Sequence, residues 1–368
     1  MAANDPNRRS LDLFNVDQNS LENFEFNFRE VMSNRDSPPA MPDTQTITES
    51  VLAYRVENGR TYHAYKDGWY YLPNDQAEIE RLRVTHDILR RAMGNRSHLT
   101  PWTRAHYPRR VLDVGTGTGD WVFDFAEEFP QTELIIGTDL SNIQPDETPP
   151  NVQFIIDDSS EEWLDDDLDF VHTRDTNGCW EDMNAQVIQQ AFAKLNPGGW
   201  LESQEIDVQL YCDDGTAPAD HGLRLWLNEL DRVSNIAGKP CSVTPHLRGW
   251  FLEAGFVDVR EEIFKVPTCG WPEDPAQREI GTWCEEMLSS GIDGIARAYQ
   301  MRVAGLTMEQ HQVALIPVRR DLRNRNYHTY INLHVVYGRK PGPDLTRYRP
   351  KMSGPEEAQA EEDEAGPA

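Results

Sequence analysis

The sequence predicts an α/β fold in which a doubly wound parallel sheet is covered by helices on both faces. Short buried apolar runs alternate along the chain with segments of helical periodicity, as in strands joined by helical crossovers. One of these runs leads directly into a turn with a glycine at every second position, within Val111–Gly119. A strand, a glycine-rich turn and a helix in this order are typical of ligand-binding α/β domains.

Four apolar runs predict the first strands, at residues 110–114, 134–137, 152–156 and 168–173. The segment after the glycine turn, residues 120–129, is predicted to be a helix. Residues 182–195 carry Val187, Ile188 and Leu195 on one helical face, so a second helix is expected there. Helices between successive strands allow those strands to run parallel in one sheet.

The second half of the chain continues this alternation with longer helical segments. A fifth strand is expected to open at Gly199–Glu202, a sixth at 256–266 and a last one at 327–338, where apolar and polar residues alternate. Helices are predicted at 219–236, at 245–254 and in the long stretch between the last two strands.

A further helix is predicted ahead of the first strand, at residues 75–93. Pro73, Asn74 and Asp75 supply a turn and a helix cap, and apolar positions then recur at helical spacing. The preceding run from Tyr62 to Leu72 is dense in aromatic residues. This run is expected either to cover an edge of the sheet or to form a lid over a ligand.

The 368 residues are expected to form one large domain between two disordered ends. The ends are rich in polar residues, proline or acid and cannot bury a core. The expected division is a disordered segment at 1–45, a helical and aromatic cap at 46–105, the main domain at 106–341 with helical insertions near 213–245 and 270–325, and a disordered acidic tail at 342–368.

The formal net charge of −27, from 62 acidic and 35 basic residues, excludes two classes of main partner. A nucleic acid needs a basic footprint on the protein, and so does an anionic membrane surface. No apolar run approaches the roughly 18 residues of a membrane-spanning helix. We therefore expect neither nucleic acid nor membrane as a partner, and expect a small molecule or another protein.

The cysteines favour a reducing compartment. There are five, an odd number, and none lies in a C-x-x-C pair. The N-terminal residues are not expected to act as a signal peptide, because they lack an apolar segment. Together these features favour free thiols over disulfides or a metal site. We expect no metal, and a cytoplasmic location with the nucleus as the alternative.

The glycine turn supplies the strongest functional signal. Gly115, Gly117 and Gly119 permit positive φ and let a ligand approach the backbone. The N–H groups of the turn and of the helix that follows can then hold a polar or anionic group. The third glycine comes one position earlier than in the dinucleotide pattern G-x-G-x-x-G.

Acidic residues stand at the ends of three expected strands, and they narrow the choice of ligand. Asp113 precedes the glycine turn, Asp139 ends the second strand, and Asp157 and Asp158 end the third. Ligands of α/β sheets bind at the carboxyl ends of strands. Carboxylates there suit an ammonium group, ribose hydroxyls and an adenine amino group, but they repel a pyrophosphate. This set predicts S-adenosylmethionine as the cofactor, over an NAD-like dinucleotide or a simple turn with surface acids.

The same segments resemble class I S-adenosylmethionine-dependent methyltransferases and, more narrowly, the fungal LaeA-like group. The resemblance covers roughly residues 57–341. The glycine turn is specific to the superfamily, and the other segments are specific to the group. The segments that carry the resemblance are Val111–Gly119, Asp139–Pro145, Pro150–Phe154, Glu57–His63, Tyr70–Asp75, Leu195–Glu202 and Asp213–Thr216.

The resemblance implies a Rossmann-like, seven-stranded sheet whose last strand is antiparallel. Thr116 departs from the family pattern, because many relatives have Cys there; a small residue is expected to be tolerated. The residues expected to bind the cofactor are Asp113, Gly115, Thr116, Gly117, Gly119, Asp139, Leu140, Asp157, Asp158 and Arg174.

Catalytic candidates lie at the end of the fourth strand and beyond it. His172 and Arg174 alternate with Thr173 and therefore face one side of the strand. An acceptor alcohol has to lose a proton to a base, and we expect His172 and His221 as candidates for that role. A structural role is the alternative for each. Arg174 is expected to line the cofactor or acceptor pocket.

Three functions remain open at this point. The first is methyl transfer to an O or N atom of a small molecule in fungal secondary metabolism. The second is a regulator like the group's namesake, which acts in the nucleus through protein partners. The third is a protein that binds the cofactor without transferring methyl. The acidic run 161–167 is expected to be a solvated connection, or else to attract a basic protein substrate.

Overall fold

The computed structural model describes residues 54–63 and 71–342. The two chain ends that the sequence predicts to be disordered, and most of the aromatic run that follows Tyr62, lie outside these residues. The two expectations for this run, that it covers a sheet edge or forms a lid, therefore stay predictions.

The seven strands of the main sheet have the order β5-β4-β3-β6-β7-β9-β8. β9 runs antiparallel to both of its neighbours, and the remaining adjacent pairs are parallel. The predicted α/β class, Rossmann-like sheet and antiparallel last strand are confirmed. The strands are β3 (Arg110–Val114), β4 (Leu134–Asp139), β5 (Val152–Ile156), β6 (Leu168–Arg174), β7 (Leu195–Ile206), β8 (Val257–Pro267) and β9 (Tyr330–Arg339).

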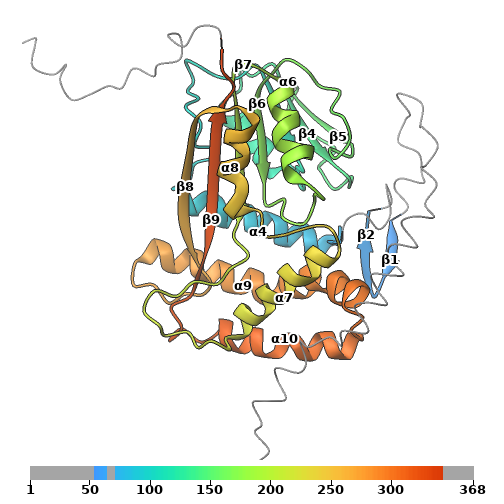
Figure 1. Cartoon of the computed structure of the whole chain (residues 1–368), viewed down its shortest axis with the longest axis vertical. Coiled ribbons are helices and arrows are strands. Elements are labelled where there is room, and N and C mark those ends of the chain that lie inside the picture. The colour runs from blue at the N-terminus through green and yellow to red at the C-terminus, as the bar shows by residue number, and fades with distance from the viewer. Residues whose placement is uncertain (1–53, 64–70, 343–368) are drawn as a thin grey trace, which may run out of the picture.

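Helices cover the sheet on both faces, and α6 and α8 lie in front of it in the view of Figure 1. The helix predicted at 182–195 begins as a π-helical turn. The fifth strand begins at Leu195, earlier than predicted. Its first residues pair with β6 in an irregular register, and Gly198 has a φ of 92°. The sequence there has no alternating pattern that would predict a strand. The helices on the sheet are α5 (Asp120–Glu128), the π-turn η1 (Asn184–Ile188) with α6 (Gln189–Lys194), and α8 (Thr244–Ala254).

The two faces of the sheet bury different apolar clusters. On β3, Val111 joins the cluster that contains Phe125 of α5, whereas Leu112 joins the cluster with Ile188 and Leu247. Successive side chains of a strand point to opposite faces. Continuous apolar runs such as 110–114 therefore predict strands that are buried on both sides.

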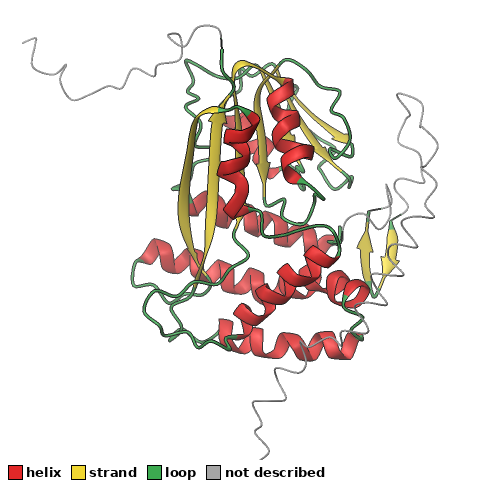
Figure 2. Cartoon of the chain, viewed as in Figure 1, coloured by secondary structure: helices red, strands yellow, loops and turns green. Residues whose placement is uncertain are grey.

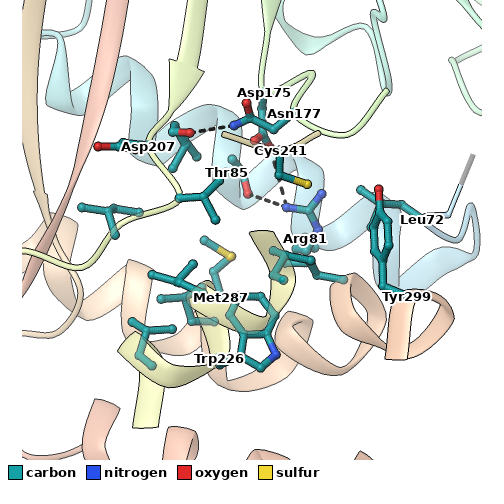
Figure 3. A pocket seen from close by; sticks show the side chains of 18 residues that line it. Leu72, Arg81, Thr85, Asp175, Asn177, Asp207, Trp226, Cys241, Met287 and Tyr299 are labelled. Atoms are coloured by element: carbon teal, nitrogen blue, oxygen red, sulfur yellow. Dashed lines mark hydrogen bonds and ion pairs between the residues drawn. The ribbon is translucent and has the colours of Figure 1, made fainter. Parts of the chain in front are cut away.

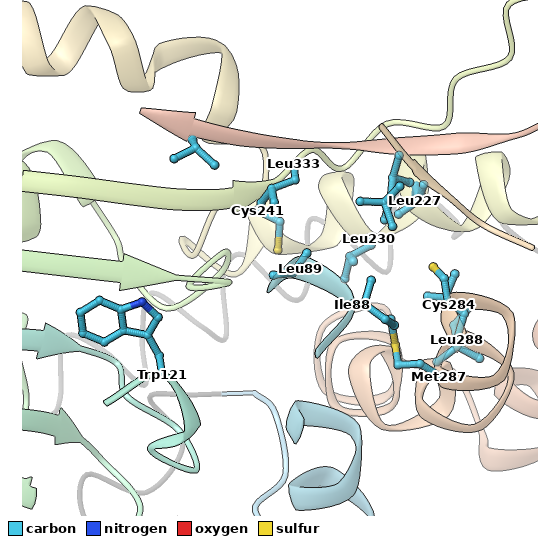
Figure 4. Packing of buried hydrophobic residues seen from close by; sticks show 14 of the residues in the cluster. Ile88, Leu89, Trp121, Leu227, Leu230, Cys241, Cys284, Met287, Leu288 and Leu333 are labelled. Atoms are coloured by element: carbon cyan, nitrogen blue, oxygen red, sulfur yellow. The ribbon is translucent and has the colours of Figure 1, made fainter. Parts of the chain in front are cut away.

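A layer of helices stands beyond the sheet, at the carboxyl ends of its parallel strands (Figures 1 and 2). Figure 4 shows apolar residues of α4, α7 and α9 packed together in its core. None of the helices in the described part of the chain is long and apolar enough to span a bilayer. The layer consists of α4 (Gln76–Ala92), α7 (Gly222–Ile236), α9 (Pro275–Ala298), the π-turn η2 (Tyr299–Val303) and α10 (Met308–Leu322).

A hairpin of β1 (Arg55–Glu57) and β2 (Arg60–Tyr62) precedes α4 and was not predicted. Its turn residues Asn58 and Gly59 have φ of 49° and 76°. Two positive φ values at an Asn-Gly pair are typical of a tight hairpin turn, so the signal was present in the sequence. The predicted cap of α4 is confirmed, because Asp75 accepts a hydrogen bond from the backbone N–H of Glu78 at 3.1 Å.

Candidate active site

Two adjoining cavities surround the glycine turn at the carboxyl ends of the parallel strands. The first, which we call the loop cavity, holds about 430 Å³ and is lined by the turn together with Asp113 and Arg174. The second, the strand-end cavity, holds about 560 Å³ and is lined by the ends of β4 and β5. Gly115 contributes to both walls. The two cavities therefore meet at the first glycine of the turn.

The glycine turn has the backbone conformation that its sequence predicts. Gly115, Gly117 and Gly119 have φ of 72°, 56° and 80°, all in the left-handed region. A Cβ at Gly119 would lie 2.5 Å from the ring of Phe154, so that position excludes any side chain. Gly119 also precedes the first residue of α5. The turn thus brings backbone N–H groups and a helix N-terminus to the wall of the loop cavity.

Asp113 is buried and held by two hydrogen bonds. Its Oδ2 accepts from the hydroxyl of Thr116 at 2.7 Å, and its Oδ1 lies 2.7 Å from Nδ1 of His172. A carboxylate only accepts, so His172 carries its proton on Nδ1. The hydroxyl of Thr116 thus helps to fix Asp113.

His172 is fully buried, and it lies in the wall of neither cavity. Its ring stacks on Trp121 with centroids 3.7 Å apart and planes 4° from parallel. Burial lowers the pKa of His172 despite the neighbouring carboxylate, so the ring is neutral. Its Nε2 has no hydrogen-bond partner among the described residues. The ring thus contacts two residues in the wall of the loop cavity, Asp113 and Trp121.

Asp139 joins the glycine turn to the end of β4. Its Oδ2 accepts from the N–H of Gly117 at 2.9 Å, and its Oδ1 accepts from the N–H of Ser141 at 2.8 Å. Burial raises the pKa of Asp139 to about 6, although these backbone donors oppose the shift. Asp139 and the adjacent Leu140 line the strand-end cavity, where the sequence places them.

Asp157 and Asp158 also line the strand-end cavity, as predicted. Oδ1 of Asp158 accepts from both the N–H and the hydroxyl of Ser160, at 2.9 and 2.6 Å. Burial raises the pKa of Asp157. Trp180 and Lys239 line the same cavity, and no sequence pattern placed Lys239 there.

Arg174 lies in the wall of the loop cavity and donates to three neutral acceptors. Nε donates to Oε1 of Gln204 at 2.7 Å, Nη2 to the carbonyl of Ser97 at 3.2 Å, and Nη1 to Nδ1 of His86 at 2.9 Å. Because a guanidinium only donates, His86 has its proton on Nε2, which lies 3.0 Å from Oδ2 of Asp124. Burial lowers the pKa of Arg174 to about 10, against the pull of surrounding carboxylates.

His86 is a site residue that sequence reasoning missed. It lies on α4 at a helical spacing that also fits a packing face, and only the tertiary structure places it against Arg174 and in the wall of the loop cavity. Thr85 and Leu82, from the same helix, line this cavity as well. The α4 helix therefore forms one wall of the site.

A third cavity, which we call the helix cavity, lies between the sheet and the helical layer and holds about 870 Å³ (Figure 3). Asp175, Asn177 and Asp207 line its sheet side, and Trp226 and Met287 line the helical side. The helical layer also contributes the polar residues Arg81, Thr85 and Tyr299. Thr85 and Asp175 belong to the walls of both the helix cavity and the loop cavity. The two cavities therefore meet at these residues.

His221 lies outside all three cavity walls. It is buried at the start of α7, where its Nδ1 accepts a hydrogen bond from the N–H of Leu223 at 3.2 Å. Its ring packs edge-on against Tyr327. The structure thus places His221 as a helix cap and does not bring it together with His172 or Asp113.

Comparisons with known proteins connect this geometry with one family. Residues 84–261 match the model of a methyltransferase domain. The chain is 34% identical to the methyltransferase pytC of Aspergillus terreus over 83% of this chain and 94% of that protein. It is 36% identical to the secondary metabolism regulator LAE1 of Cochliobolus heterostrophus, over 78% and 94% of the two chains. It is 31% identical to the protein-methionine methyltransferase laeA of Emericella nidulans, over 84% and 82%.

Proposed function

The chain belongs to the S-adenosylmethionine-dependent methyltransferases, in the fungal group that includes pytC and laeA, and from that premise we propose its reaction. It transfers a methyl group to an O or N atom of a small molecule with an apolar body, in fungal secondary metabolism. The main support for this proposal is that the helix cavity and the loop cavity share the wall residues Thr85 and Asp175.

The loop cavity fits the methionine end of the cofactor. Asp113 offers a carboxylate to its ammonium group. Arg174 is a buried cation whose nitrogens donate to neutral groups, although carboxylates lie near it, and its remaining N–H groups can donate to an anion. The carboxylate of the cofactor is that anion. When bound, S-adenosylmethionine supplies an electrophilic methyl group on a positively charged sulfur.

The strand-end cavity fits the adenosine end. Asp139 can accept hydrogen bonds from both ribose hydroxyls, because each of its oxygens has one donor and a remaining lone pair. Leu140 contributes apolar surface beside it. Asp157 and Asp158 stand where an adenine amino group is accommodated. Carboxylates at both ends of the site disfavour a phosphate-containing cofactor.

The two histidines act away from the reacting atoms under this proposal. His172 fixes the orientation of Asp113 through its Nδ1 and serves as a positioning residue. His221 stabilises the start of α7, which forms part of the wall of the helix cavity. The proton of the acceptor therefore goes to another group.

The helix cavity receives the acceptor. It is lined mostly by apolar side chains, as small-molecule sites are, and Asp175, Asn177 and Asp207 supply polar groups on its sheet side. An acceptor with one polar end and an apolar body would place its polar end against Asp175 and its body against α7 and α9. Holding the reacting atoms in line in a dry pocket provides much of the acceleration.

A second candidate is a regulatory role with a protein side chain as acceptor. It is favoured by the names of the relatives, which include secondary metabolism regulators and a protein-methionine methyltransferase that match over most of their length. Under this candidate the protein works with protein partners and in the nucleus. The helix cavity would then accept a single side chain, and most of its apolar wall would be unused.

Metabolite profiling of a strain that lacks the gene separates the two candidates. Accumulation of one compound that lacks a methyl group supports the biosynthetic function. Simultaneous loss of many unrelated metabolites supports the regulatory one. Calorimetric titration of the purified protein with S-adenosylmethionine is the companion test, since absence of binding would contradict both.

A further inference from the structure

We propose that Asp175 is the general base that takes the proton of the acceptor during methyl transfer. This inference rests on the proposed function and assigns a catalytic residue to it. Neither the family comparisons nor the histidine candidates of the sequence point to Asp175. The assignment rests on the position of Asp175 between two cavities, on its backbone conformation and on the charged groups that surround it.

Asp175 stands where the two substrates meet. It follows β6 directly, and it lines both the loop cavity and the helix cavity. Thr85 is the other residue shared by these walls, and its hydroxyl accepts a hydrogen bond from Arg81 at 3.4 Å. A threonine hydroxyl is too weak a base for this role, so Asp175 is the proton acceptor at the junction.

The backbone holds Asp175 in a conformation that residues other than glycine seldom adopt. Its φ is 52°, in the left-handed region, which Asp and Asn enter more readily than other residues with a side chain. The N–H of Asp175 donates to the carbonyl of Gln204 at 3.0 Å. Asn177 anchors the following turn by donating to the carbonyl of Ile206 at 2.6 Å. These two hydrogen bonds fix the main chain on both sides of the carboxylate.

Charged groups on three elements face the carboxylate of Asp175. Arg81 of α4 approaches its Oδ2 at 3.8 Å, and Glu78 of the same helix pairs with Arg81 at 2.8 Å. Arg174 precedes it on β6, and the buried Glu205 of β7 braces the turn after it by accepting from Thr176. Burial raises the pKa of Asp175, and Arg81 opposes that rise. A raised pKa makes a carboxylate a better base.

The other titratable groups in the wall of the helix cavity are less suited to the role. Asp207 already accepts hydrogen bonds from the hydroxyls of Tyr211 and Thr244. Burial raises the pKa of Cys241 to about 11 and that of Tyr299 well above its usual value. Both remain protonated near neutral pH and cannot accept a proton.

The proposed methyl transfer accounts for every bond and for the proton. The acceptor heteroatom forms a bond to the methyl carbon, and the sulfur–carbon bond breaks with its electron pair remaining on sulfur. The proton of the acceptor passes to the carboxylate of Asp175, which releases it to solvent after the product leaves. The step requires no oxidant and no metal.

The test uses 2-naphthol as a probe of the helix cavity, with the full-length protein saturated with S-adenosylhomocysteine. The excited state of 2-naphthol is a strong acid, so its emission moves to the longer-wavelength naphtholate band when a base lies within hydrogen-bond reach. Asp175→Asn is the matched variant, because Asn tolerates the left-handed region as Asp does. Asp207→Asn controls for the other carboxylate in the wall. Thermal melting and calorimetry with S-adenosylhomocysteine check each variant for folding and cofactor binding.

We expect bound 2-naphthol to emit mainly as naphtholate in the wild type and in Asp207→Asn, and mainly as naphthol in Asp175→Asn. Unchanged emission in Asp175→Asn, or a change only in Asp207→Asn, would overturn the assignment while leaving the proposed function intact. Loss of S-adenosylhomocysteine binding in Asp175→Asn would place the residue in the cofactor site and overturn it too. Failure of the wild type to bind 2-naphthol would refute the acceptor role of the helix cavity, and with it this proposal.

Discussion

Asp113 Oδ1 and His172 Nδ1 are 2.7 Å apart, and the imidazole that holds Asp113 stacks in parallel on Trp121. The histidine on β6 thus acts on the cofactor site from behind the acid on β3. The two residues are partners across neighbouring parallel strands, which explains why a contact so remote in sequence forms.

Replacing the two candidate histidines should have different consequences. His172→Phe keeps a ring beside Trp121 but removes the donor to Asp113, and we expect about tenfold weaker S-adenosylhomocysteine binding, or about 1.4 kcal/mol. His221→Ala removes a helix cap, which costs about 1 kcal/mol of stability, and leaves the affinity unchanged. Calorimetry and urea unfolding measure the two effects. Equal affinities of wild type and His172→Phe would contradict the positioning role.

The carboxylate of Asp113 should contribute directly to cofactor affinity. Asp113→Asn keeps the shape of the side chain but loses the charge that we propose faces the ammonium group of the cofactor, so binding should weaken about 10-fold or more. Asp166→Asn is the matched control, because Asp166 lies on the solvated acidic run with its side chain 69% exposed. Calorimetry with S-adenosylmethionine compares the two, and a similar loss in both variants would point to a general charge effect.

Removing the charge of Arg174 should weaken binding through the carboxylate of the cofactor. Arg174→Gln retains a hydrogen-bond donor but no cation, and we expect about tenfold weaker binding of S-adenosylhomocysteine. A ligand without that carboxylate, 5′-methylthioadenosine, serves as the control, since its affinity should not change. If both ligands lose affinity equally, Arg174 does not face the carboxylate.

Cofactor binding should strengthen as pH rises through about 6, the value to which burial raises the pKa of Asp139. In the proposed site the ionised carboxylate would accept from both ribose hydroxyls, whereas the protonated form would offer one fewer acceptor. The stability of the unliganded protein should depend on pH in the opposite direction. Because the pKa of Asp139 is higher in the folded than in the unfolded state, its contribution to stability is present below the unfolded-state pKa and is lost as pH rises through the folded-state pKa. Titration calorimetry from about pH 5 to about pH 7.5, compared with Asp139→Asn, isolates this contribution. The same pH slope in the variant would exclude Asp139 as its source.

Two glycine substitutions should differ in sign. Gly119→Ala places a Cβ 2.5 Å from Phe154 at a φ of 80°, and we expect a loss of about 2 kcal/mol or more in the free energy of unfolding. Gly249→Ala lies in α8, where the new Cβ meets nothing within 4 Å. It should gain up to about 1 kcal/mol from helix propensity. Urea unfolding of both variants measures the difference.

The sequence alone predicts those site residues that lie along single strands. Asp113, Asp139, Asp157 and Asp158 end consecutive strands, so the topology of a parallel sheet already brings them to one edge. The glycine positions predict their own backbone conformation. Asn58 and Gly59 also encoded a hairpin, but three-residue strands leave too short a pattern to detect.

The rest depends on how separate elements pack. His86 looks like a packing residue of α4 until Arg174 is seen beside it. Asp175 acquires its position from a backbone conformation that residue type does not dictate. The helix cavity is built from helices inserted far apart in the chain, so its shape and polarity exist only in the folded protein.

The most direct test of the central claim is to follow a labelled methyl group. Purified protein is incubated with S-adenosylmethionine carrying a radioactive methyl and with a small-molecule extract from the strain that lacks the gene. We predict that label enters one low-molecular-weight compound, and that Asp175→Asn slows this transfer by about 100-fold. Label that appears only on protein, or on no small molecule in the extract, would contradict the account.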